Sequence, residues 1–223
     1  FASFNMIIPE LPGYLTALGG AEYKGFIISL FTLTAMISRP FSGKLTDRIG
    51  RIPVMVFGAG GCFIIGFLYP MISSIAGFMV IRLFHGFSTG FKPTGTVAYV
   101  AGIVPQERRG EAMGLSGVFG TLGMSSGPSI GGAIAQHYSL DVMFYTSSAF
   151  AILSILVLLG MKATLENKQR FRLEHLRIHR NEIIDKAAIP VAIFMMLTVY
   201  SYGVVLTIIP DFSDHLHVGN RGT

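Results

Sequence analysis

The sequence contains little charge: Asp, Glu, Lys and Arg make up 13% of its 223 residues, about half the fraction that is usual in soluble domains. Its single cysteine, Cys62, excludes a disulfide within the chain. It also has no glycine-rich nucleotide loop, no His/Cys metal cluster and no Ser-His-Asp spacing that would indicate a triad. We therefore expect no enzyme chemistry, no catalytic residue, no cofactor and no metal site.

Apolar residues and glycine are what the chain has in excess: 51% of residues are hydrophobic, the mean hydropathy is +0.59, and 27 residues are glycine. The apolar runs approach or exceed the roughly 20 residues that a membrane-spanning helix needs. The sequence therefore predicts an all-α integral membrane bundle. The expected spans are 25–44, 52–71, 76–101, 111–135, 142–161 and 187–209, preceded by an apolar run at 1–18 that we interpret as the outer part of a truncated first helix.

Basic residues are distributed unevenly among the turns between these runs. Twelve lie in 43–53, 103–111 and 162–186, whereas the alternate turns contain only Lys24 and Arg221. Because basic turns remain on the cytoplasmic side of a membrane, the pattern predicts a multi-pass protein of the cell membrane with a cytoplasmic N-terminus. The net charge of +5 is then explained by topology in a lipid bilayer, and nucleic-acid binding is not expected.

A short motif recurs after about 200 residues: Ile7-Ile8-Pro9-Glu10 is echoed by Ile208-Ile209-Pro210-Asp211. Six spans per period predict two six-helix halves in parallel orientation. We expect an N-terminal bundle at 1–162, a cytoplasmic linker at 163–186, and the seventh helix with its outer loop at 187–223. The rest of the C-terminal half would be absent from this chain. The linker could be a solvated connector or a helix on the membrane surface.

The run 76–101 carries a polar stripe whose members are three or four residues apart, so that they share one helical face. Such a face must contact protein or water rather than lipid. We expect it to line a central cavity; the alternative for its arginine is a hydrogen bond to neighbouring carbonyls. The stripe consists of Arg82, His85, Thr89, Lys92, Thr96 and Tyr99.

Glu10 is the acidic residue that the prediction places inside a span of the first half. An ionisable residue within the membrane is costly and is therefore a functional candidate. Glu10 could pair with Arg82 or take up and release a proton, or it could lie at headgroup level beside Pro9 and Pro12. Asn5, about one and a half helical turns away, adds polarity and is a further candidate for the cavity lining.

The run 111–135 has glycines at spacings of three and four, which allow another helix backbone to approach closely. Pro128 is expected to bend the helix within this row. We interpret the row as a packing seam rather than a catalytic feature. Its glycines are Gly117, Gly120, Gly123, Gly127 and Gly131.

Three segments resemble signature motifs of the major facilitator superfamily, in the expected spans and order. Gly43-x-x-x-Asp47-Arg48-x-Gly50-Arg51 resembles motif A, Arg82-x-x-x-Gly86 resembles motif B, and Gly123-x-x-x-Gly127-Pro128-x-x-Gly131-Gly132 is similar to motif C. The resemblance covers the whole chain. Ile52 and Thr46 depart from the usual form of motif A, but they leave its Gly-Asp-Gly frame intact.

The resemblance implies twelve helices in two bundles that rock about a central site. It further implies that motif A forms a cytoplasmic gate, in which Asp47 faces a helix of the second half, and that the motif B arginine is associated with proton coupling. Motif C is the antiporter signature, so the resemblance implies a proton-coupled exporter of a small organic or amphipathic solute, similar to drug exporters. Arg39-Pro40 and Phe91-Lys92-Pro93 also resemble, more distantly, bacterial exporters of opine-type metallophores.

Other functional classes remain open at this stage. A metabolite importer or symporter would share the fold, and a non-transporting membrane scaffold or receptor would share the hydropathy pattern. A seven-helix retinal protein fits poorly, because the run 187–209 has no lysine for a Schiff base.

Overall fold

The structure is a computed structural model that describes residues 1–165, 168–178 and 186–200. Throughout these ranges the regular secondary structure is helical, which confirms the predicted all-α class. The chain divides into two compact units, Phe1–Arg177 and Ile178–Thr223. The boundary falls inside the predicted linker. The motif echo at 208–211 lies outside the described residues.

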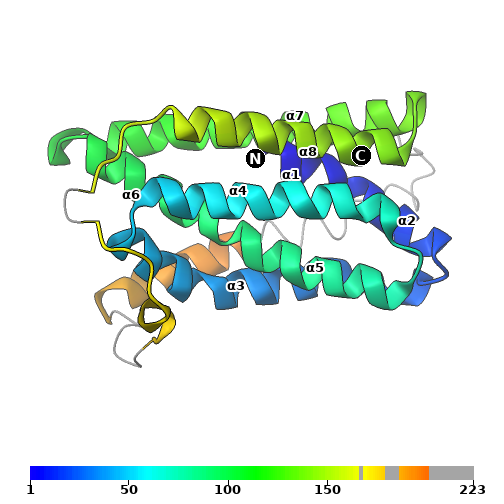
Figure 1. The fold of residues 1–223 in the computed structure, drawn as a ribbon, viewed down its shortest axis with the longest axis horizontal. Helices are drawn as coiled ribbons and strands as arrows, with labels where there is room; N and C mark the ends of the chain where they lie inside the picture. The colour runs from blue at the N-terminus through cyan, green and yellow to red at the C-terminus, as the bar shows by residue number, and fades with distance from the viewer. Residues whose placement is uncertain (166–167, 179–185, 201–223) are drawn as a thin grey trace. The chain divides into compact units, whose positions relative to one another are not determined.

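The first unit is a bundle of eight α-helices with short 3-10 turns between some of them (Figure 1). In its described part the second unit has a 3-10 turn, η7 (Lys186–Ala188), and a short apolar helix, Ile189–Tyr200. The α-helices of the first unit are α1 (Ala2–Ile7), α2 (Leu11–Ala17), α3 (Gly25–Arg48), α4 (Arg51–Leu68), α5 (Ile75–Thr89), α6 (Phe91–Ile103), α7 (Arg109–His137) and α8 (Leu140–Leu159).

The run 1–18 is not one α-helix as expected. A 3-10 turn, η1 (Ile8–Glu10), separates α1 from α2. Pro9 and Pro12 lack the amide hydrogens that would continue the i to i−4 pattern, so the helix tightens at this point.

The run 76–101 is likewise divided, into α5 and α6, with Gly90 between them. Pro93, two residues into α6, has no amide hydrogen to donate to the carbonyl of Thr89. Ser74 caps the start of α5 by accepting a hydrogen bond from the amide of Gly77 at 3.2 Å. The polar stripe therefore extends over two helices rather than one.

Helix α3 continues four residues beyond its expected end and includes Lys44, Asp47 and Arg48. Most of the segment expected to be a turn is thus the end of a helix. The chain reverses at Ile49 and Gly50, where Gly50 has φ +111°. Only glycine adopts this conformation at low cost, which explains the sharp boundary between α3 and α4.

Three of the described helical segments are long and apolar enough to cross a membrane: Gly25–Arg48, Arg51–Met71 and Leu140–Leu159. The expected span 187–209 lies partly outside the described residues, and the remaining expected spans differ for local reasons. Two are divided at proline or glycine, and α7 is long but rich in glycine. Large apolar side chains stand exposed along α3 and α8, among them Met36, Leu153 and Leu156.

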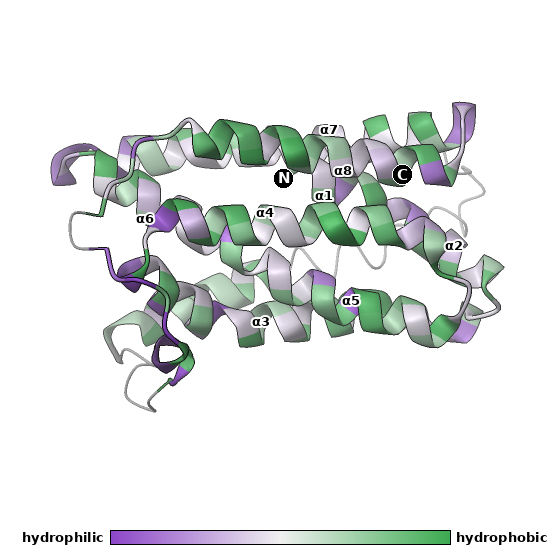
Figure 2. Ribbon diagram, viewed as in Figure 1, coloured by the Kyte–Doolittle hydropathy of each residue, from purple (hydrophilic) through white to green (hydrophobic). Residues whose placement is uncertain are grey.

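Packing within the first unit positions the candidate site. Helix α4 packs on α5, α6 and α8, while α1 packs on α7 and α8, and α3 packs on α5 and α6. A buried cluster at one end includes Tyr69, whose ring stacks on Phe144 at 4.9 Å between centroids. The long helices are mainly hydrophobic in Figure 2.

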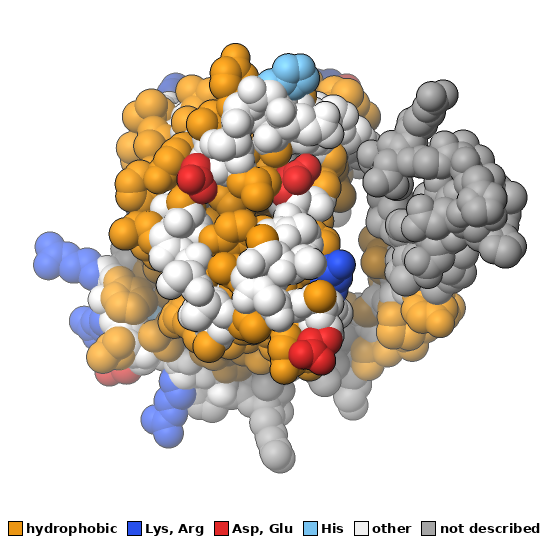
Figure 3. All heavy atoms as spheres, turned by 90° about the vertical axis from the view of Figure 1, so that its right-hand side faces the viewer, with side chains coloured by type: hydrophobic (Ala, Val, Ile, Leu, Met, Phe, Trp, Pro, Cys, Tyr) orange, Lys and Arg blue, Asp and Glu red, His pale blue; other side chains and the backbone are white. Residues whose placement is uncertain are grey.

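The two ends of the first unit differ in charge. The turns after α3, α6 and α8 gather at one end, on the left in Figure 1, and these are the basic turns of the sequence. Figure 3 looks onto the opposite end, where acidic and apolar side chains share the surface.

Candidate functional site

A pocket of about 190 Å³ lies among the helices of the first unit. Its wall is largely apolar and aromatic, with a few polar side chains set into it. The lining residues are Phe1, Ser3, Phe4, Asn5, Phe31, Ala59, Cys62, Thr89, Lys92, Pro93, Thr96, Met124 and Ala151. The pocket brings together four of the predicted cavity residues: Asn5, Thr89, Lys92 and Thr96.

Lys92 supplies the cationic side chain of this pocket. It stands next to Pro93 at the start of α6, and its Nζ donates to Oγ of Ser154 on α8 at 2.7 Å. One turn earlier, the hydroxyl of Thr89 donates to the carbonyl of His85 at 2.8 Å. The break at Gly90 thus places a lysine and a threonine on the wall of an otherwise apolar cavity.

Arg82 is fully buried and does not line this pocket. Its Nε and Nη2 donate to the carbonyl oxygen of Ile27 on α3 at 2.9 and 2.7 Å. Nη1 donates to the Tyr69 hydroxyl at 3.5 Å, and the guanidinium carbon lies 4.7 Å from the centre of the Phe31 ring. The observed geometry is the carbonyl-bonded alternative considered for this arginine.

His85 and Tyr99, the other two members of the stripe, are also outside the pocket lining. His85 is 1% exposed and approaches the Tyr69 hydroxyl with Nδ1 at 3.4 Å. The rings of Phe4 and Phe31 stand nearly perpendicular to the His85 ring, with centroids 5.4 and 5.8 Å away. The Tyr99 hydroxyl donates to the carbonyl of Lys162 at 3.2 Å. Arg82 and His85 contact groups outside the pocket, whereas Thr89, Lys92 and Thr96 line it, so helical periodicity alone does not direct all six side chains to one cavity.

Glu10 is half-buried at the join between η1 and α2. It makes no ion pair with Arg82 within the described part of the chain. A Cβ atom added at Gly132 of α7 would lie 3.8 Å from Oε1 of Glu10. Glu10 therefore stands against the glycine face of α7, separate from the arginine.

The glycine row of α7 packs on α1. A Cβ at Gly127 would lie 2.9 Å from the Ala2 carbonyl oxygen and 3.0 Å from the Met6 amide nitrogen, and one at Gly131 would collide with the Met6 carbonyl. Gly123 and Gly120 face Phe1. Gly117, in contrast, has no such neighbour within 4 Å. Pro128 lies inside α7, which remains one helix.

The motif A residues lie where α3 ends and α4 begins. Arg51 donates through Nη1 to the hydroxyl of Thr164 at 2.7 Å, and its guanidinium covers Gly102 of α6. Gly43 has open space where a Cβ would be. Asp47 and Arg48 are exposed on the last turn of α3, and their side chains make no hydrogen bond or ion pair within the described residues.

Sequence reasoning missed two contacts that hold the site together. Ser3 and Ser147 exchange hydrogen bonds between α1 and α8: the Ser3 hydroxyl donates to the Ser147 carbonyl at 2.8 Å, and the Ser147 hydroxyl donates to the Ser3 carbonyl at 2.6 Å. The Ile27 carbonyl is the second: a carbonyl partner for Arg82 was one of the expected alternatives, but the sequence did not show which carbonyl it would be. Isolated serines and a backbone oxygen give no signal in a hydropathy pattern, so neither contact could have been found without coordinates.

Known proteins share this architecture. The multidrug resistance protein MdtG of Escherichia fergusonii is 32% identical over 183 residues, covering 79% of this chain and 45% of that protein. MdtG of Serratia proteamaculans is 33% identical with 79% and 44% coverage. The crystal structure of the human organic anion transporter MFSD10 (TETRAN) superposes with a TM-score of 0.63 at 24% identity, covering 74% of this chain and 45% of that chain.

The comparisons also show how much of each relative this chain covers. The chain spans about half the length of the curated relatives it matches, 45% and 44% for the two MdtG proteins. The sequence model of the Major Facilitator Superfamily matches residues 1–223. The chain therefore belongs to the Major Facilitator Superfamily, whose members are multi-pass membrane proteins.

Proposed function

We propose that this chain forms one wall of a proton-coupled efflux antiporter that exports a small organic or amphipathic solute by alternating access. The observation that carries the proposal is the similarity of about 32% to multidrug resistance proteins over most of the chain. The direction of transport and the use of protons are part of the proposal.

The chemistry of the pocket supports an amphipathic solute. Phe4 and Phe31 offer aromatic faces, and Asn5 and Thr96 offer hydrogen-bonding groups on the same wall. Ligand sites commonly combine a predominantly apolar surface with a few fixed polar groups. Lys92 would favour a solute that carries a negative or strongly polar group. A second bundle, absent from this chain, would supply the opposing wall.

We propose that Glu10 or Arg82 takes part in proton coupling, and the two residues would have different roles. Glu10 is a half-buried acid next to the α1–α7 seam and can gain or lose a proton as the seam changes. Arg82 is assigned a structural part in coupling. It would act by holding α5 to α3 through the Ile27 carbonyl rather than by titrating.

We predict that Glu10→Gln abolishes uphill efflux while preserving downhill solute exchange, since glutamine mimics the protonated acid. The measurement is solute flux in proteoliposomes that contain the complete two-bundle transporter, with and without an imposed pH gradient. Gradient-driven accumulation should fall at least about tenfold, and exchange without a gradient should remain within about twofold of the unmodified protein.

Glu22→Gln is the matched control, because Glu22 is an exposed acid in the neighbouring turn. It should leave both fluxes unchanged. Full gradient-driven efflux by the Glu10 variant would remove this residue from the coupling step, and an unmodified protein that moves solute with no proton flux would overturn the antiporter proposal. The 223-residue chain alone is expected not to transport.

The gate proposal rests on Asp47. An acid in the last turn of a helix faces the negative end of the helix dipole, which disfavours it by about 0.3–1 kcal/mol. Asp47 has no compensating partner among the described residues. Its position is thus better explained by a partner outside this bundle, such as the positive N-terminal end of a helix in the second half. The open space over Gly43 would admit that helix.

We predict that Asp47→Asn leaves insertion and stability unchanged but weakens closure on the cytoplasmic side. The measurement is labelling of Thr96→Cys, in a Cys62→Ser background, by a membrane-impermeant maleimide added from that side. Labelling should become several-fold faster with Asp47→Asn. Glu107→Gln, which removes another exposed acid, should not change the rate. Equal rates in all three proteins would contradict the gate.

A further inference from the structure

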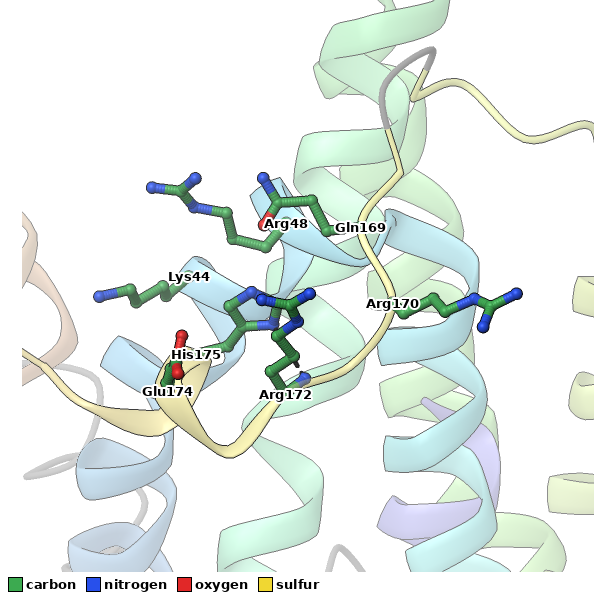
Figure 4. Close-up of a pocket in the computed structure, with 7 residues that line it drawn as sticks. All are labelled: Lys44, Arg48, Gln169, Arg170, Arg172, Glu174 and His175. Carbon is green, nitrogen blue, oxygen red and sulfur yellow. Dashed lines mark hydrogen bonds between the residues drawn. The ribbon is translucent and has the colours of Figure 1, made fainter.

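A second, larger pocket of about 570 Å³ lies at the basic end of the first unit (Figure 4). It forms where the last turns of α3 meet residues 168–177, which we call the strap. It shares helix α3 with the solute pocket but has no lining residue in common with it. Its lining residues are Lys44, Arg48, Gln169, Arg170, Arg172, Glu174 and His175.

Hydrogen bonds fix the strap to the end of α3. The amide of Gln169 donates to the carbonyl of Arg48 at 2.9 Å, which satisfies one of the orphan carbonyls at the helix end. Lys44 Nζ donates to the carbonyl of Arg177 at 2.8 Å. Within the strap, the amide of Arg172 donates to Nδ1 of His175 at 3.3 Å, as drawn in Figure 4. The pocket is therefore held at both ends of the strap.

The pocket carries a strong excess of positive charge. Lys44, Arg48, Arg170 and Arg172 stand against the single acid Glu174. The side chains of the three arginines make no hydrogen bond or ion pair in the part of the chain that the structure describes. Figure 4 shows Arg170 pointing away from the other basic side chains, whereas Arg48 and Arg172 approach the pocket from α3 and from the strap. Like charges in one pocket repel one another, so an anion would relieve the repulsion.

We propose that this pocket binds the phosphate group of an anionic phospholipid at the membrane surface. Guanidinium groups are well suited to phosphate, because their planar set of donors can bind two oxygens at once. Arg48 and Arg172 would bind the phosphate from opposite sides, one from α3 and one from the strap. His175, next to Arg172 in Figure 4, would add a hydrogen-bond donor through Nε2, because its Nδ1 accepts from the Arg172 amide.

Exposed apolar side chains in the strap favour a lipid over a soluble phosphate. Phe171 is 54% exposed and Leu173 is 78% exposed, and they alternate with Arg170 and Arg172 along the chain. A segment that alternates exposed apolar and basic residues beside the end of a membrane-spanning helix suits the bilayer interface, where acyl chains and headgroups meet. A soluble anion would gain nothing from Phe171 or Leu173.

The test is a binding titration with the purified, delipidated full chain in a mild detergent, read by native mass spectrometry. The probes are dioctanoyl phosphatidylglycerol, dioctanoyl phosphatidylcholine and sn-glycerol 3-phosphate. They separate an anionic lipid, a zwitterionic lipid with the same chains, and the headgroup phosphate without chains. We expect phosphatidylglycerol to bind at least about fivefold more tightly than either of the other probes.

Arg172→Gln should weaken phosphatidylglycerol binding by about fivefold, the value for one basic residue near an anionic surface. Leu173→Ser should weaken it as well, without changing the charge. Arg109→Gln is the matched control, because Arg109 is an exposed arginine of another basic turn and does not line the pocket. It should remain within twofold of the unmodified chain.

Three outcomes would overturn the proposal. Equal binding of the two lipids would show that the acyl chains alone account for affinity. Equal binding of glycerol 3-phosphate would make the occupant a soluble phosphate. An equal loss in the Arg109 and Arg172 variants would reduce the effect to overall charge. None of these measurements requires transport, so the result is independent of the proposed antiporter function.

Discussion

Arg82→Ala is expected to cause a large loss of stability, about 3 kcal/mol or more. The substitution removes two charge-assisted hydrogen bonds to the Ile27 carbonyl, each worth about 1.5–3 kcal/mol. It also empties the space of the largest fully buried side chain. The measurement is the midpoint of thermal aggregation in detergent, followed by size-exclusion chromatography.

Two further variants make this prediction specific. Arg82→Lys keeps the charge but cannot direct two donors at one oxygen, so its midpoint should lie between those of the unmodified and alanine proteins. Arg39→Ala removes an exposed arginine of α3 and should have little effect. If the Arg82→Ala and Arg39→Ala proteins had the same midpoint of thermal aggregation, the Ile27 contact would contribute nothing to stability.

Gly127→Leu is expected to separate α1 from α7 and to destabilise the bundle by about 3 kcal/mol. The new Cβ would meet the Ala2 carbonyl at 2.9 Å and Cβ of Asn5 at 3.0 Å, distances below ordinary contact. Because two of its three nearest neighbours are backbone atoms, no rotamer change can make room, and overpacking of this kind costs about 1–3 kcal/mol or more. In the complete transporter the variant should also lose transport, since Asn5 moves with α1.

The control for this substitution is Gly60→Leu. Gly60 lies in the membrane-spanning α4, and a Cβ there would meet nothing within 4 Å. The stability of Gly60→Leu should lie within about 1 kcal/mol of that of the unmodified chain. The stability of Gly127→Ala should lie between those of the two leucine variants. The thermal assay described for Arg82 applies unchanged. A Gly127→Leu protein as stable as Gly60→Leu would mean that α1 does not press on α7.

Hydropathy and residue spacing were sufficient for the architecture but not for the partners of polar groups. Apolar runs predicted the all-α bundle, because lipid imposes a length on every span. The same periodicity put Arg82 and Lys92 on one face and could not show that Gly90 divides that face. Arg82 donates to a backbone oxygen on α3. Because every residue has a backbone oxygen, the sequence cannot indicate which one an arginine will bind.

The end of α3 is a second feature that the sequence did not predict correctly. The glycines and charges of 43–51 read as a turn, yet helix α3 continues through Arg48 and only Gly50 breaks it. Charged residues tolerate a helix as well as a turn when they are exposed. Positive φ at Gly50 depends on how α3 and α4 pack, which local composition does not encode.

The uneven hydropathy of the helices has a consequence for how the chain is built during synthesis. Helices α3 and α4 are each apolar enough to partition into the bilayer unaided and are joined by only two residues. They can leave the translocon together as a hairpin with its basic tip held back. Helix α7 is rich in glycine and so exposes less apolar surface to lipid. Its insertion into the bilayer would be stabilised most by packing on helices that are already inserted. Helix α1, which packs on α7 and α8, would then reach its final position only after those two helices are in place.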